Sequence, residues 1–222
     1  MLRLIIICAG LLTFSSGAQA GAWAREKGAV FVSVGGNFWL SDGAQLPVYY
    51  DPTLYLEYGA TEKLTLGLDI HTADAGRIAT AFMFARMPLG DADARHKFAA
   101  TLSLGARANT LGETESLIRG GLSWGMGLEN GWLSVDASAT RDANDPTFRA
   151  KVDFTYGHHW NDKFTTSLQL QTGQGLTNDS YAKIAPSLIF NLRENIQLSI
   201  GAVHALTGDR GTGLKFETWL SF

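Results

Sequence analysis

The stretch "GLKFETWLSF", residues 213–222, alternates apolar with polar side chains and finishes on a phenylalanine. Its apolar positions are Leu214, Phe216, Leu220 and Phe222. The positions between them include Lys215, Glu217 and Ser221. Because successive side chains of a β-strand point to opposite faces, this pattern predicts a strand with one apolar face and one charged face.

The same alternation recurs along the chain from residue 29 onward. It marks twelve runs: 29–40, 52–60, 63–72, 77–87, 96–108, 116–128, 131–141, 147–160, 163–173, 181–192, 195–205 and 212–222. Short polar turns such as Asn161-Asp162 alternate with longer segments rich in Gly, Asp and Asn, such as "SDGAQLPVYYD" at 41–51. This order predicts antiparallel strands joined successively by hairpins.

The two faces of these runs differ in charge. The apolar faces of the twelve runs carry almost no charged residue. Arg86, at the end of its run, is the clear exception. The other face collects Glu57, Asp69, Arg107, Arg119, Asp136, Arg149, Lys151, Asp153, Lys183, Lys215 and Glu217. A soluble sandwich also alternates, but it buries its apolar face and shows denser apolar runs. The sparse pattern favours the reverse arrangement, with lipid outside and a polar interior.

Aromatic residues near the short turns support that arrangement. Those assigned to the outward ring are Tyr58, Phe84, Phe98, Tyr156, Trp160, Phe164, Phe190 and Phe222. Such a ring is typical of a transmembrane barrel at a membrane interface. The predicted fold class is therefore all-β: a membrane-spanning, antiparallel up-and-down β-barrel of about 12 strands.

The first twenty residues have the parts of a cleaved signal peptide. Arg3 precedes an uncharged apolar run at 4–14, and Ala18-Gln19-Ala20 follows it with small residues around a cleavage position. The apolar run is shorter than the roughly 20 residues of a helical membrane span. Residues 21–222 are then expected to form a single barrel domain. Cys8, the one cysteine of the sequence, would leave with the signal peptide, which excludes a disulfide framework and a Cys-based metal site.

The closing stretch resembles the C-terminal signal of bacterial outer-membrane β-barrel proteins, although Thr218 departs from the apolar alternation. The resemblance extends to the signal peptide, the even strand number and the short turns on one side, and it identifies no specific family. It implies a protein in outer-membrane lipid, exported through the signal peptide, and we expect this protein to be a monomer. It also implies that the barrel-assembly machinery reads Leu214, Phe216, Leu220 and Phe222. The formal net charge of −3 gives no indication of a nucleic-acid partner.

The residues favour no enzyme, cofactor or metal. Outer-membrane phospholipase A places its catalytic His and Ser two residues apart on one strand. None of the five histidines here has a serine at that spacing. The G-x-S-x-G match at residues 121–125 lies inside the strand run 116–128 and not at a strand-to-helix turn, so it does not form the nucleophile elbow of a hydrolase. His158 and His159 are adjacent, so on a strand they would point to opposite faces and could not readily share one ion.

The predicted interior charges leave two possibilities. They form ion pairs that fill the barrel, as between Lys151 and Asp153, or they line water between opposed basic and acidic walls. Twelve strands enclose more space than the eight that side chains fill, and the residues before the first strand are too few for a full plug. The leading prediction is a narrow passive channel for small polar or weakly anionic solutes. The alternative is a non-conducting barrel with an envelope-support or interaction role.

Overall fold

The computed structural model describes residues 21–40, 49–91, 93–143, 147–208 and 211–222. Over these residues the chain forms twelve β-strands. They are β1 (Val30–Leu40), β2 (Tyr49–Thr61), β3 (Leu64–Ala73), β4 (Ile78–Leu89), β5 (His96–Asn109), β6 (Thr114–Leu128), β7 (Gly131–Asp142), β8 (Phe148–His159), β9 (Phe164–Gln174), β10 (Ser180–Arg193), β11 (Ile196–Thr207) and β12 (Thr212–Ser221).

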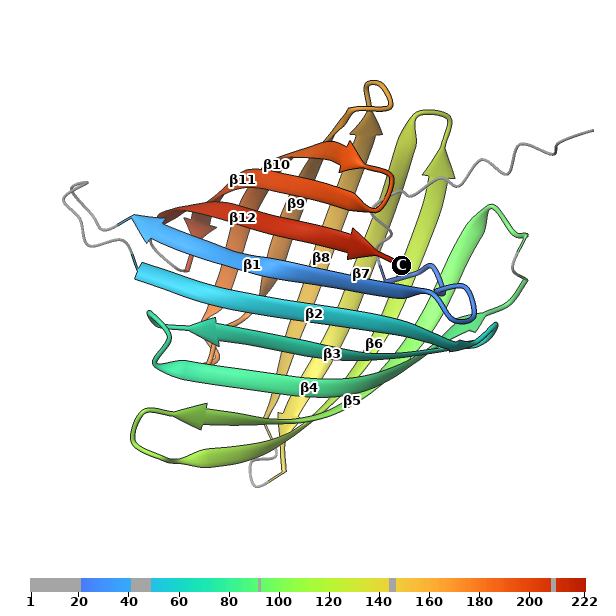
Figure 1. The fold of residues 1–222 in the computed structure, drawn as a ribbon. Coiled ribbons are helices and arrows are strands. Elements are labelled where there is room, and N and C mark those ends of the chain that lie inside the picture. Colours follow the sequence, from blue (N-terminus) through green and yellow to red (C-terminus); the bar gives the residue numbers. More distant parts are fainter. Residues whose placement is uncertain (1–20, 41–48, 92, 144–146, 209–210) are drawn as a thin grey trace, which may run out of the picture.

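The strands close into a barrel (Figure 1). Each strand pairs antiparallel with the next one in sequence, and β12 pairs with β1. Beyond the last strand residue, Phe222 and Val30 exchange two backbone hydrogen bonds of 2.9 Å, so the pairing continues to the end of the chain. The prediction of a closed, antiparallel barrel of twelve strands is confirmed.

The predicted strand boundaries agree with the observed ones to within three residues. The largest difference is in β2, which begins at Tyr49 rather than at 52. Residues 41–48 of the preceding loop, like the predicted signal peptide at 1–20, lie outside the described residues. Within the described part of the chain, no helix is long and apolar enough to cross a membrane.

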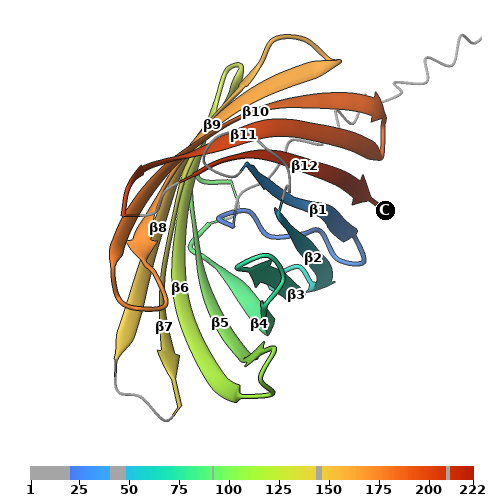
Figure 2. The same cartoon turned by 90° about the vertical axis from the view of Figure 1, so that its left-hand side faces the viewer.

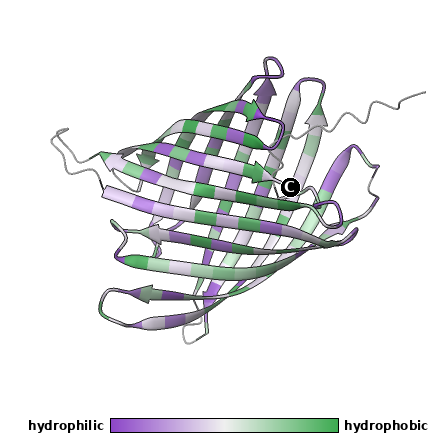
Figure 3. Cartoon of the chain, viewed as in Figure 1, coloured by the Kyte–Doolittle hydropathy of each residue, from purple (hydrophilic) through white to green (hydrophobic). Residues whose placement is uncertain are grey.

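Hydropathy alternates along the strands of the barrel (Figure 3). Large apolar side chains on the outer surface are widely exposed, among them Leu102 at 58% and Leu122 at 63%. On the opposite face of β5 the small polar side chain of Ser103 is covered and only 1% exposed. The chain thus places much of its apolar surface outward, as a barrel surrounded by lipid requires.

Strand β4 differs from the prediction, because the face expected to point outward points into the barrel. Phe84, assigned to the outward ring, is 5% exposed and lies in the interior, whereas Met83 is 70% exposed. Gly67 on β3 pairs with Phe84, and a Cβ at Gly67 would lie 2.1 Å from the Phe84 ring. Gly105 on β5 pairs with Phe82 in the same way. The two glycines leave the space in which both rings turn inward.

Candidate functional site in the barrel interior

The barrel encloses a cavity of about 480 Å³. It is bounded by residues of nine strands, and both polar and aromatic side chains line it. The polar lining includes Asn37, Asp69, His71, Asp136, Gln169, Gln171, Lys183, Lys215 and Glu217. The aromatic lining comprises Phe31, Trp39, Tyr55, Trp132 and Trp219. Such a surface offers hydrogen bonds, charge and flat apolar faces to a solute.

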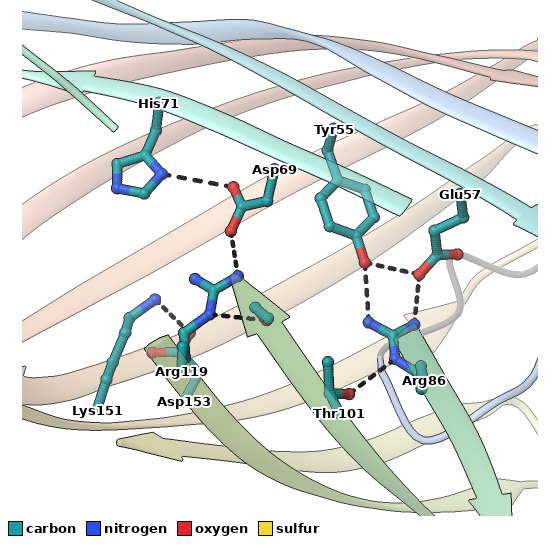
Figure 4. A network of polar contacts seen from close by, with 10 residues as sticks. Tyr55, Glu57, Asp69, His71, Arg86, Thr101, Arg119, Lys151 and Asp153 are labelled. Atoms are coloured by element: carbon teal, nitrogen blue, oxygen red, sulfur yellow. Dashed lines mark hydrogen bonds and ion pairs between the residues drawn. The ribbon is translucent and has the colours of Figure 1, made fainter. Parts of the chain in front are cut away.

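A buried ionic cluster centres on Glu57 of β2, whose side chain is 2% exposed (Figure 4). Its carboxylate accepts hydrogen bonds from both Arg25 and Arg86. The Tyr55 hydroxyl donates to Oε1 of Glu57 at 2.6 Å and accepts from Nη2 of Arg86 at 2.9 Å. The Phe84 ring stacks on Tyr55 with centroids 5.6 Å apart. Two guanidinium groups therefore share one carboxylate in a closely packed setting.

A second cluster joins non-adjacent strands across the interior (Figure 4). Nη2 of Arg119, on β6, lies 2.8 Å from Oδ2 of Asp69, on β3. The other carboxylate oxygen of Asp69 lies 3.4 Å from Nδ1 of His71. The Arg119 guanidinium covers the Phe82 ring at 4.0 Å from its centroid. This pair links one predicted basic wall with the predicted acidic wall.

Further interior charges pair along single strands. Nζ of Lys151 lies 2.7 Å from Oδ2 of Asp153, and Nζ of Lys215 lies 3.1 Å from Oε2 of Glu217. Both pairs join residues two positions apart, which share a face of their strand. The local pairing that the sequence analysis held open between Lys151 and Asp153 is therefore present. It weakens any field between opposed walls.

The remaining predicted interior charges have varied surroundings. Nη1 of Arg107 binds Oε2 of Glu115 at 2.7 Å. The Lys183 ammonium lies over the Trp39 ring at 4.9 Å. Asp136 lines the cavity. Nη2 of Arg149 is buried and has no hydrogen-bond partner among the described residues.

Two interior arginines were not among the predicted set. Arg86 was counted on the apolar face, yet it is 7% exposed and held by Glu57. A charged residue inside an apolar run was the signal that the inner and outer faces predicted for β4 were exchanged. Arg25 precedes the first strand, where strand periodicity gives no information about direction. Its side chain nevertheless reaches Glu57.

The two adjacent histidines have separate neighbours, in agreement with opposite faces. His158 lies between Tyr156 and Trp160, with ring centroids at 6.4 and 4.6 Å. His159 lies beside Trp132 and within 2.8 Å of the Thr165 hydroxyl. In the described part of the chain, no group of three or more His, Cys, Asp or Glu side chains is placed to hold a metal ion.

The protein resembles known proteins in its structure and not in its sequence. The sequence matches no protein-family model and no curated protein.

Among solved structures, the chain is similar to an outer-membrane channel from Pseudomonas putida F1, with a TM-score of 0.66 and 15% identity over 93% of this chain and 100% of that one. It is similar to the KdgM porin, with a TM-score of 0.62 and 10% identity over 86% of this chain and 99% of the porin. The NanC porin gives a TM-score of 0.59 at 12% identity, over 86% of this chain and 98% of the porin. The chain thus has the fold of small outer-membrane β-barrel channels.

Proposed function

We propose that the protein is a monomeric outer-membrane β-barrel that acts as a narrow passive channel for small polar or weakly anionic solutes. The observation that carries this proposal is the cavity of about 480 Å³, with its polar and aromatic lining. A barrel that served only as a scaffold would not need interior space of this kind. The shared fold with the KdgM and NanC porins supports the same assignment.

The proposal includes the route to the membrane. Residues 1–20 act as a cleaved signal peptide, and the outer membrane receives residues 21–222 as one domain. The barrel-assembly machinery reads Leu214, Phe216, Leu220 and Phe222 on the last strand. The pairing of β12 with β1 supports this role, because it is the contact that closes the barrel. No enzymatic activity is part of the proposal.

The non-conducting alternative is favoured by a different observation. Glu57, Asp69, Asp153 and Glu217 each bind at least one basic side chain in the interior. A lumen filled by such pairs stiffens the wall, and a rigid closed barrel suits an envelope-support or interaction role. The cavity that remains beside these pairs is the reason to prefer the channel.

Liposome swelling separates the two functions. Purified protein in vesicles should admit small neutral and singly anionic solutes and exclude large oligosaccharides. Vesicles without protein and vesicles with heat-unfolded protein are the controls. Swelling rates equal to those of empty vesicles for every solute would establish the non-conducting alternative.

A further inference from the structure

The segment before β1, residues 21–27, lies inside one end of the barrel (blue coil in Figure 2). Ala22 is 2% exposed. The Trp23 ring occupies the space above Gly125 of β6, because a Cβ at Gly125 would lie 2.4 Å from Cη2 of that ring. A glycine at 125 is therefore what allows the tryptophan to rest on the wall.

The other end of the segment is fixed to β2 and β3. The Arg25 side chain binds Glu57, and its backbone N–H donates to Oγ1 of Thr65 at 3.2 Å. The Arg25 guanidinium also covers the Phe31 ring at 4.4 Å. At the barrel wall, Gly28 donates to the carbonyl of Gly59 at 2.7 Å.

These contacts lie on two separate parts of the wall. In the closed order of twelve strands, β2 and β3 are three to five strand positions away from β6 and β7. At about 3.4 Å per extended residue, the segment is long enough to cross the interior. It crosses at the end where both the C-terminus and the β2–β3 turn lie (Figure 1).

The beginning of the segment meets a carboxylate. A Cβ built on Gly21 would lie 2.6 Å from Oδ1 of Asp136 and 2.7 Å from Oγ of Ser123. By bond geometry the Gly21 nitrogen then lies within about 5 Å of that oxygen. Nη2 of Arg86 lies 3.5 Å from the same Cβ, but it donates its hydrogen bond to the Tyr55 hydroxyl, and among the described residues Asp136 forms no ion pair. A buried carboxylate of this kind is stabilised by a cation placed beside it.

We propose that residues 21–27 are a plug that closes the short-turn end of the passage, and that Asp136 with Ser123 binds the α-ammonium group of Gly21. That ammonium is produced when the signal peptide is cleaved between Ala20 and Gly21. The plug is then held on one wall by Arg25 and Glu57 and on the other by the new N-terminus. This inference deepens the proposed channel function and rests on it. It revises the expectation that the residues before β1 are too few to close the lumen.

The channel arm of the test uses Gly125→Ala, Trp23→Ala and the control Gly127→Ala. Gly127 is two residues along the same strand and face, and a Cβ there would meet nothing within 4 Å. In single-channel recordings, Gly125→Ala and Trp23→Ala should each raise the open probability several-fold. Gly127→Ala should match the wild type, and Gly125→Ala should add little when Trp23 is already Ala. A wild-type channel that these substitutions leave unchanged would overturn the plug and leave the channel function standing.

The amine arm does not depend on conduction. Folded protein is treated with a reagent selective for N-terminal amines, and the extent of modification at Gly21 is read by mass spectrometry. The wild type should react several-fold more slowly than Asp136→Asn. Glu217→Gln, which removes an interior carboxylate on β12, should behave as the wild type. Equal reactivity of wild type and Asp136→Asn, or an N-terminus at another residue, would overturn the proposal. A protected amine in a protein that never conducts would uphold the site and refute only the channel.

Discussion

Glu57 shows what a single interior residue does in this barrel. Its carboxylate is almost fully covered and is shared by two arginines and a tyrosine. Ions in such surroundings lose their hydration, so the cluster holds together only while every partner is present. Phe84 and Thr101 complete the surroundings of Arg86.

Glu57→Gln should therefore destabilise the barrel strongly. It leaves two buried guanidinium groups without a counter-charge, a change that costs about 3–5 kcal/mol in buried pairs. Urea unfolding in detergent micelles, followed by gel migration with and without heating, measures the loss. Glu62→Gln, in the exposed β2–β3 turn, is the matched control and should unfold as the wild type. Equal midpoints for the two variants would contradict the assigned role.

Substitutions of Arg149 and Arg119 distinguish an effect on ion selectivity from an effect on the stability of the barrel. Arg149→Gln removes an interior positive charge whose Nη2 has no hydrogen-bond partner in the described part of the protein, so the anion-to-cation permeability ratio should fall with little loss of stability. Arg119→Gln should lower the ratio too, but at a cost of about 1–3 kcal/mol, because Asp69 loses its guanidinium. Reversal potentials in a salt gradient and thermal melting measure both effects. A lower melting temperature for Arg149→Gln with unchanged selectivity would mark Arg149 as structural.

At the scale of the strand, β4 gives the sharpest test of which side faces lipid. Spin labels at Met83→Cys and Met87→Cys should collide freely with oxygen, which concentrates in the bilayer. A label at Thr80→Cys, on the inward face, should not. Power-saturation measurements in vesicles give these accessibilities. A high oxygen accessibility at Thr80 and a low one at Met83 would restore the opposite orientation of the strand.

The elements show which features periodicity can predict. Eleven runs have one face that is clearly apolar, so their direction follows from period-two alternation alone. In β4 apolar side chains stand on both faces, and only the glycines at 67 and 105 on the neighbouring strands decide which rings fit inside. The pairing register between strands determines which residues lie opposite each other, and the sequence of one run alone does not reveal that register. The segment 21–27 has no strand period at all, so its place in the interior depends on contacts with distant residues such as Gly125 and Thr65.

The same reason limits prediction of the site. Lys151 and Asp153 are two residues apart on one strand, so their pairing follows from strand geometry. Asp69 and Arg119 are fifty positions apart in sequence. They meet only because closure and stagger of the barrel bring β3 and β6 to the same level.

For the whole molecule, the closed order of strands predicts the sides on which the loops lie. The start of β1, the C-terminus and the short turns share one end of the barrel (Figure 1), and the proposed export route places that end in the periplasm. Epitope tags in residues 140–146 or 175–179 should therefore be labelled on intact cells, and a tag at Asn161-Asp162 should be labelled only after permeabilisation. Surface labelling at Asn161-Asp162 alone would show that the barrel is inserted the other way round.

The central claim is that this barrel encloses a polar passage that conducts small solutes across a membrane. Single-channel recording of the refolded wild-type protein, residues 21–222, in a planar bilayer tests it most directly. We expect small, discrete conductance steps with a weak preference for anions. Protein that migrates as folded barrel and inserts into the bilayer, yet gives no discrete steps at any voltage, would contradict it.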